Sequence, residues 1–240
     1  MNAELGLVNV WVQGDWITRG VALVLLGMSL SSWVVMLNKC LDLRNYGAQA
    51  KAVDQFWFSP DFASGVEKLG TTPANPFHAL ALQAFEASRH QQAAQPMIHH
   101  ALDMSDWLTR ALRNSMDSST ARLQSGLAVL ASVGSTAPFV GLFGTVWGIY
   151  HALLSIGAAG QASIDKVAGP VGEALIMTAL GLAVAIPAVL GYNALVRGNK
   201  SVLNKLNRFA HDLHAYFLTG TRVRSGNPAN DGIAFHLQQA

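Results

Sequence analysis

Glu173 is the residue of this chain whose type and setting most strongly indicate chemistry. It is the only charged residue between positions 167 and 196. A carboxylate in an apolar membrane span costs about 2.5 kcal/mol or more on insertion scales, and such residues usually belong to an ion or proton path. The alternative is a protonated or paired carboxylate that serves packing alone.

Two threonines lie at nearly equal distances on either side of a polar stretch at residues 158–166. If this stretch is the turn of an antiparallel helical hairpin, Thr145 and Thr178 lie at similar depth. Glu173 then lies roughly 7.5 Å closer to the turn. The spacing therefore predicts a similar depth for the two threonines, with Glu173 further outward. An alternative, which the spacing alone favours, is that each threonine hydroxyl bonds the carbonyl four residues earlier in its own helix.

The elements that must position these residues are predicted to be membrane helices. The chain has 240 residues, of which 51% are hydrophobic and only 12% are charged, against about 25% charged in soluble domains. We predict an all-α membrane protein with three transmembrane helices, each long enough to cross about 30 Å of hydrocarbon. Their predicted bounds are 16–38, 127–157 and 167–196.

Basic residues are distributed unequally around these spans. Of the 16 Lys and Arg residues, only Arg19 and Lys166 fall on one side, and the positive-inside bias makes that side the outer one. The periplasmic parts are then the amino-terminal segment 1–15 and the turn 158–166. The cytoplasmic parts are a helical domain at 39–126, a helix at 197–218 and a flexible tail at 219–240. A net charge of +2 gives no argument for nucleic-acid binding.

The cytoplasmic part carries helix signals of its own. Asn75 followed by Pro76 predicts a helix start. No strong helix breaker occurs between Met97 and Gly126, so the second membrane helix could begin in the cytoplasm and run on to Ile156. The third helix is predicted to continue inward as well, on an apolar stripe. This stripe consists of Val202, Leu203, Leu206, Phe209, Ala210, Leu213 and Phe217.

Small residues are abundant in the second and third spans. Because they occur all round the third helix, they predict close packing on several faces, and hence a many-helix bundle formed by an oligomer. The packing candidates are Gly144, Gly148, Gly181 and Ala185. Prolines are tolerated in membrane helices and can kink them. The candidate kinks are Pro138, Pro170 and Pro187.

Enzymatic and metal-binding sites receive little support. Ser132 or Ser135 with His151 could suggest a serine hydrolase, but no feature of the sequence brings them together. His211 and His214 share a helix face, and no third metal ligand lies nearby. We therefore predict no catalytic residue, no metal and no cofactor.

Two motifs resemble the MotA/TolQ/ExbB proton-channel family. The second-span motif is APFVGLFGTVWG at residues 137–148. The third-span motif is GPVGEAL at 169–175, followed by TALG at 178–181 and AIPA at 185–188. The order of the spans and the long cytoplasmic loop agree as well. KVAGP at 166–170 favours the TonB-system branch. The Tol branch shares both span motifs, whereas the flagellar stator branch has four spans.

The resemblance implies a homopentamer around a central pore in the bacterial inner membrane, with protons as the coupling ion. It implies that ExbD-like single-span helices enter the pore, each bringing an aspartate, and that Glu173, Thr145 and Thr178 line the proton-responsive region. It also implies that the energy reaches TonB, which drives uptake of iron-siderophores and similar cargo. A Tol-type role in envelope integrity and a non-conducting membrane scaffold are the alternatives.

Overall fold

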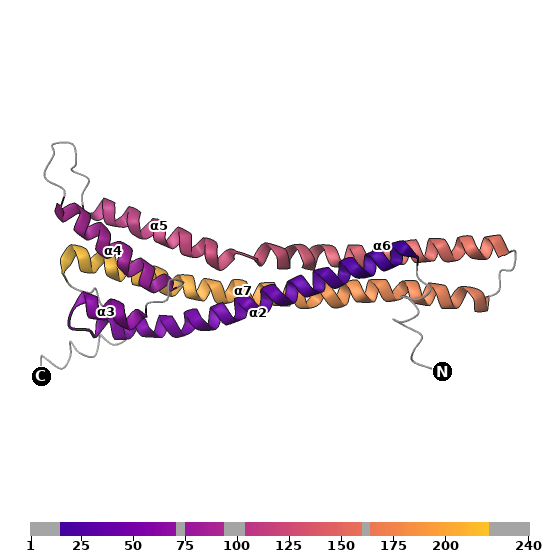
Figure 1. Cartoon of the computed structure of the whole chain (residues 1–240), viewed down its shortest axis with the longest axis horizontal. Coiled ribbons are helices and arrows are strands. Elements are labelled where there is room, and N and C mark those ends of the chain that lie inside the picture. Colours follow the sequence, from indigo (N-terminus) through magenta and orange to yellow (C-terminus); the bar gives the residue numbers. More distant parts are fainter. Residues whose placement is uncertain (1–14, 71–74, 94–103, 160–163, 221–240) are drawn as a thin grey trace, which may run out of the picture. The chain divides into compact units, whose positions relative to one another are not determined.

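The computed structural model describes residues 15–70, 75–93, 104–159 and 164–220 (Figure 1). The helices of this part follow one another along the chain as α2 (Trp16–Trp57), α3 (Phe62–Leu69), α4 (Pro76–Ala93), α5 (Met104–Gln124), α6 (Leu127–Ala159) and α7 (Ile164–Thr219). Three helical stretches are long and apolar enough to cross a membrane: Trp16–Trp57, Met104–Leu154 and Ala174–Thr219. The all-α class and the three candidate membrane-spanning helices agree with the prediction. The segment 1–14, the turn residues 160–163 and the tail 221–240 lie outside the described residues.

The predicted start of the helix after Asn75 is confirmed. The Asn75 Oδ1 atom accepts hydrogen bonds from the amides of Phe77 at 3.0 Å and His78 at 3.4 Å, as an N-cap does. Its Nδ2 atom donates to the carbonyl of Leu69 at 2.6 Å. One buried side chain therefore begins α4 and also ties it to the end of α3.

Helix α3 has a charged cap, which the sequence analysis did not single out. The carboxylate of Asp61 accepts hydrogen bonds from the hydroxyl and the backbone amide of Ser64. The bond from the Ser64 hydroxyl, and then the bond from its amide, lower the pKa of this exposed carboxyl from its usual 3.8.

The helix predicted from Met97 to Ile156 differs from the structure at one place. The chain breaks the helix at Ser125 and Gly126, because Gly126 has φ +80°, a value that L side chains rarely adopt. Side chains of α2 and α7 form hydrogen bonds with residues at the break. The Asn199 Nδ2 atom of α7 donates to the carbonyl of Leu123 at 2.7 Å, and the Lys39 Nζ atom of α2 donates to the Ser125 hydroxyl at 2.9 Å. Residues 97–103 lie outside the described part.

Helix α2 is longer than the span predicted from it. It continues to Trp57, well beyond the predicted end of the first span at residue 38. The prediction extended only the second and third helices, because charged residues follow Asn38. The added turns nevertheless carry apolar anchors: Phe56 is buried, and Leu43 contacts the backbone position of Gly198.

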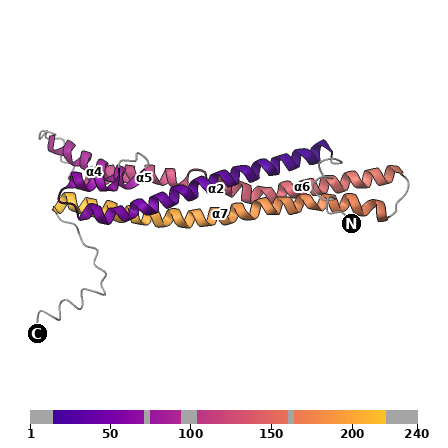
Figure 2. The ribbon, with the colours of Figure 1, turned by 60° about the horizontal axis from the view of Figure 1, so that its bottom comes forward.

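The chain divides into two compact units, and the boundaries fall within α2 and α7 and next to the break at Gly126. The first consists of Met1–Arg44 and Leu123–Lys200, and the second of Asn45–Arg122 and Ser201–Ala240. In the first unit, α6 and α7 run side by side in both ribbon views (Figures 1 and 2).

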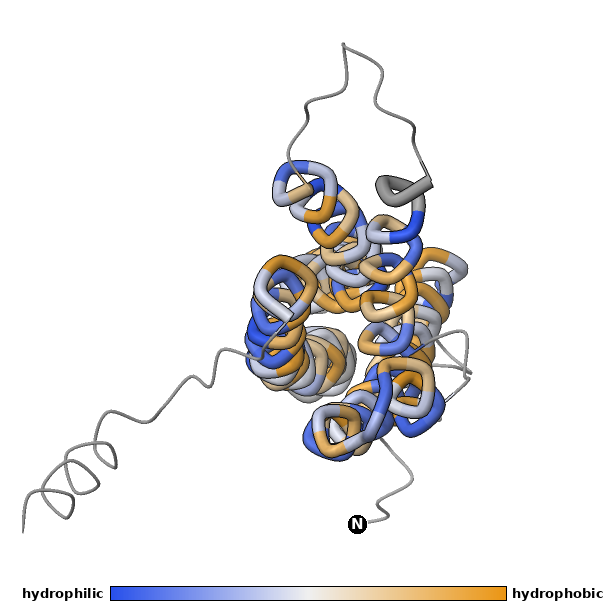
Figure 3. The backbone as a smooth tube through the Cα atoms, turned by 90° about the vertical axis from the view of Figure 1, so that its left-hand side faces the viewer, coloured by the Kyte–Doolittle hydropathy of each residue, from blue (hydrophilic) through white to orange (hydrophobic). Residues whose placement is uncertain are grey.

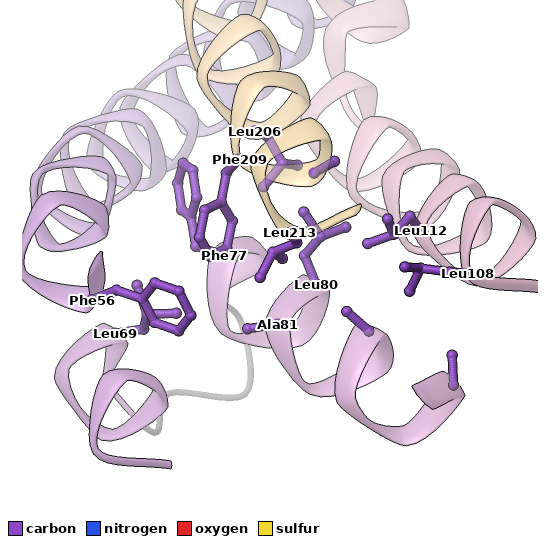
Figure 4. Close-up of a cluster of buried hydrophobic side chains, with 13 residues drawn as sticks. Phe56, Leu69, Phe77, Leu80, Ala81, Leu108, Leu112, Leu206, Phe209 and Leu213 are labelled. Carbon is purple, nitrogen blue, oxygen red and sulfur yellow. The ribbon is translucent and has the colours of Figure 1, made fainter. Parts of the chain in front are cut away.

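The second unit has an apolar core to which five helices contribute. Figure 4 shows the side chains of this core pointing toward one another from α2, α3, α4, α5 and α7. The predicted stripe on α7 supplies the completely buried Leu206 and Leu213 and the nearly buried Phe209. The helices in the near part of Figure 3 carry hydrophilic as well as hydrophobic residues, as expected for helices that have one face in water.

Candidate functional site

Thr145 of α6 and Thr178 of α7 meet inside the first unit. Their hydroxyl oxygens lie 2.5 Å apart, and Thr145 is buried with 5% of its surface exposed. The predicted equal depth of the two residues is therefore confirmed by a direct contact. Their part in a proton path stays a prediction.

The alternative interpretation of Thr145 also holds, because its hydroxyl oxygen has two carbonyls within reach. It lies 3.1 Å from the carbonyl of Gly141, four residues earlier, and 3.2 Å from the carbonyl of Ala174 on α7. A hydroxyl donates one hydrogen bond and accepts up to two. Thr145 can thus donate to either carbonyl while it accepts a bond from Thr178, so its hydroxyl can link the two helices without giving up its local bond.

Glu173 lies on α7, five residues before Thr178. This separation corresponds to roughly 7.5 Å along the helix. The side chains of Glu173 and Pro170 lie outside the described part of the structure. The predicted roles of both residues therefore stay predictions.

The backbones of the two helices approach each other closely where glycines face one another. A Cβ atom added to Gly181 would lie 2.6 Å from the carbonyl oxygen of Ala137 and 3.1 Å from the Cα of Gly141. A Cβ atom on Gly141 would lie 2.6 Å from the carbonyl oxygen of Met177. These contacts involve backbone atoms, which cannot turn away as a side chain can. The threonine pair is therefore held in a seam that only glycine permits at these two positions.

The other packing candidates lie at the same seam. A Cβ atom on Gly148 would lie 2.9 Å from the Cβ of Ala174, and one on Gly144 would lie 3.2 Å from the Cβ of Met177. Ala185 is buried, with 4% exposed.

Gly134 and Gly141 also have a packing role, which was not predicted from the sequence. A Cβ atom on Gly134 would lie 2.5 Å from a methyl carbon of Val189. A signal was present, because Gly134, Gly141 and Gly148 recur at intervals of seven, the repeat that keeps one helix face against a partner.

Helix α2 fits into further glycine positions of the first unit. Side chains of α2 occupy the space where a glycine lacks a Cβ atom, which brings α2 close to both other helices. The pairs are Val21 with Gly144, Val35 with Gly126, Met36 with Gly191, and Leu43 with Gly198. Gly144 thus contacts two helices at once.

Pro138 and Pro187 lie inside α6 and α7, and both helices continue through them. Each proline lacks the amide that would donate to the carbonyl four residues earlier. Kinks at these positions stay predictions.

The candidate hydrolase residues do not come together. Ser135 and His151 lie on the same helix, sixteen residues apart, which corresponds to about 24 Å. The Ser135 hydroxyl donates to the carbonyl of Ser132, and His151 faces Asp15 instead. The geometry therefore excludes this Ser–His pair within one chain.

In the part of the chain that the structure describes, His211 and His214 have no third metal-ligand side chain beside them. His214 lies 3.3 Å from the Ser105 hydroxyl and 3.2 Å from the Thr109 hydroxyl of α5, and His211 is exposed. Within residues 15–70, 75–93, 104–159 and 164–220, no three His, Cys, Asp or Glu side chains gather as metal ligands.

Comparison with known proteins agrees with the motifs. The model of the MotA/TolQ/ExbB proton channel family matches residues 77–208. A protein of Xanthomonas campestris named biopolymer transport protein ExbB is 47% identical over 88% of this chain and 86% of its own length. A protein of the same name from Neisseria meningitidis is 42% identical, over 89% of this chain and 98% of its own. The Tol-Pal system protein TolQ of Haemophilus influenzae is 32% identical, over 81% and 86%.

Proposed function

Since this chain belongs to the MotA/TolQ/ExbB proton channel family, we propose that it is an ExbB-type motor subunit of the bacterial inner membrane. In this proposal it uses the proton motive force, together with an ExbD-like partner, to energise TonB. TonB in turn drives the uptake of iron-siderophores and similar cargo across the outer membrane. The amino terminus lies in the periplasm and the carboxyl terminus in the cytoplasm.

The observation that carries the proposal is the paired threonine hydroxyls in a close-packed apolar seam. Thr145 and Thr178 provide polar oxygens between α6 and α7, where apolar side chains would suffice for packing. Glu173 adds a titratable group on the same helix as Thr178. Protons need such a sequence of polar groups to enter a hydrocarbon layer.

This polar set is too short to conduct protons by itself. One carboxylate cannot relay a proton across about 30 Å of hydrocarbon, so water or a partner must provide the remaining groups. A single-span helix that carries an aspartate meets this need, which supports a heteromeric channel. We propose a homopentamer that surrounds two such helices, with Glu173, Thr145 and Thr178 toward the pore.

The energy available per proton limits how the motor can work. One charge that crosses 100 mV releases about 2.3 kcal/mol. Mechanical work on TonB therefore requires several protons, or strain that accumulates over several transfers. In the proposed mechanism, protonation changes how the polar ring holds the partner's aspartate, and the inner helix then rotates or shifts.

The TonB role is favoured over the Tol role by the relatives. Those named ExbB are 47% and 42% identical to this chain, whereas the one named TolQ is 32% identical. A TolQ-like subunit remains the second candidate because it shares both span motifs. A non-conducting scaffold is a third candidate, which would need no titratable residue at position 173.

The test is deletion of the gene in its own host, followed by two measurements. Loss of iron-siderophore uptake with normal resistance to detergent is the expected result, restored by the wild-type chain on a plasmid. Normal uptake with detergent sensitivity would instead assign the chain to the Tol role. Co-purification from native membranes is expected to recover an ExbD-like protein in a fixed ratio, and its absence would contradict the proposal.

A further inference from the structure

A second titratable contact lies apart from the threonine seam. The Nε2 atom of His151 on α6 is 3.2 Å from a carboxylate oxygen of Asp15, whose backbone carbonyl accepts the first hydrogen bond of α2. His151 is six residues beyond Thr145 and so points about 120° away from it around α6. The contact therefore joins α6 to the beginning of α2, whereas the threonines join α6 to α7.

The His151 ring contacts an aromatic ring of its own helix as well as the Asp15 carboxylate. The Trp147 ring stacks on the imidazole, with 4.8 Å between the centroids and 28° between the planes. A positive charge over an aromatic face is favourable, and the carboxylate of Asp15 adds an opposite charge. An imidazolium at position 151 would thus contact both a carboxylate and an aromatic face.

The membrane helices bring further titratable groups to this end of the unit. Arg19 lies one turn after Asp15 on α2, and Tyr150 precedes His151 on α6. On α7, Asp165, Lys166 and Glu173 lie toward the same turn, and their side chains are outside the described part. Histidine is the residue whose ordinary charge change falls between pH 5 and 8, whereas an aspartate is already ionised in that range.

We propose that Asp15 and His151 form a proton-dependent latch between the first and second membrane helices. When His151 is protonated, the ion pair holds the start of α2 against α6. When His151 is neutral, the Coulomb attraction is lost and this end of α2 can move away. The latch is a property of this chain alone and does not depend on the proposed motor function.

The test measures the distance between α2 and α6 as a function of pH. Cys40 is the only cysteine, so a Cys40→Ser chain with Gly20→Cys and Leu154→Cys carries two spin labels. A Cβ atom at Gly20 would meet nothing within 4 Å, and Leu154 is 53% exposed. The labelled protein is diluted with unlabelled chain before reconstitution, so that the distances report on single chains.

When the pH is lowered from 8 to 5, the ratio of chains with a short spin-label distance to chains with a long one should rise about two- to five-fold. This is the size of effect expected for a half-exposed ion pair. The response should vanish in His151→Gln and in Asp15→Asn, and it should persist in the control Arg19→Gln. The double change Asp15→Lys with His151→Glu should hold the short distance at all pH values from 6 to 8. A pH-independent distance in the wild-type sequence, or an unchanged response in His151→Gln, would overturn the latch.

Discussion

The surroundings of Thr145 closely define what its side chain can do. Its hydroxyl lies between a carbonyl of its own helix, a carbonyl of α7 and the hydroxyl of Thr178. Serine keeps a hydroxyl at this place, whereas valine keeps the shape of threonine without the hydroxyl. Substitutions of Thr145 can therefore distinguish a polar role of its side chain from a packing role.

Replacement of Thr145 by valine keeps the shape and removes the hydroxyl. We expect Thr145→Val to abolish most iron-siderophore uptake and to cost about 0.6–1 kcal/mol of stability, the usual value of a hydrogen bond between membrane helices. Thr145→Ser keeps the hydroxyl and should retain most of the uptake. Equal uptake in the two variants, at equal amounts of assembled protein, would reduce the threonine pair to packing.

The similar depth of Thr145 and Thr178 could be predicted from the sequence because an antiparallel hairpin relates residues by their distance from its turn. Their direct contact and the carbonyl partners of the Thr145 hydroxyl could not be predicted, since they depend on the rotation of each helix about its own axis. The contact of His151 with Asp15 was unpredictable for the same reason. It joins positions 136 residues apart, and nothing in the local pattern relates them.

At the scale of elements, the seam between α6 and α7 depends on glycines that oppose backbone atoms. Gly181→Ala would place a methyl group 2.6 Å from the carbonyl oxygen of Ala137, so the helices must separate. We expect a loss of about 1–3 kcal/mol, as overpacking usually costs. Thermal unfolding of the purified protein in detergent measures this loss of stability.

The matched control for the seam is Gly27→Ala on α2. A Cβ atom there would meet nothing within 4 Å, and alanine is the better helix former. Gly27→Ala should therefore unfold at the same temperature as the wild type or slightly above it. If both variants unfold alike, close approach of backbones does not stabilise the seam.

The first and last residues of a helix could be predicted where the sequence carries a local signal. Helix ends without such a signal could not. Asn75 and Pro76 marked the start of α4, and the apolar stripe marked the continuation of α7. The extension of α2 to Trp57 lacked such a signal, because charged residues follow Asn38 and the helix is supported by tertiary contacts of Leu43 and Phe56. The break at Gly126 depends on one left-handed residue in an otherwise helical sequence.

At the scale of the whole molecule, a single chain leaves much apolar surface uncovered. Large apolar side chains are exposed along all three candidate membrane helices, for example Leu30 at 59%, Phe139 at 71% and Leu190 at 64%. Lipid covers such surface in a membrane, and so do further copies of the chain. The number of copies cannot be derived from one chain, because lipid-facing and subunit-facing residues are equally apolar.

The central claim is that a titratable group at position 173 couples protons to transport. The most direct measurement is iron-siderophore uptake by cells in which Glu173→Gln replaces the wild-type chain, at equal amounts of assembled complex. Glutamine keeps the size and polarity of the glutamate side chain, but its amide cannot take up or release a proton at physiological pH. We predict that uptake falls to the level of the deletion strain, and uptake at the wild-type rate would contradict the account.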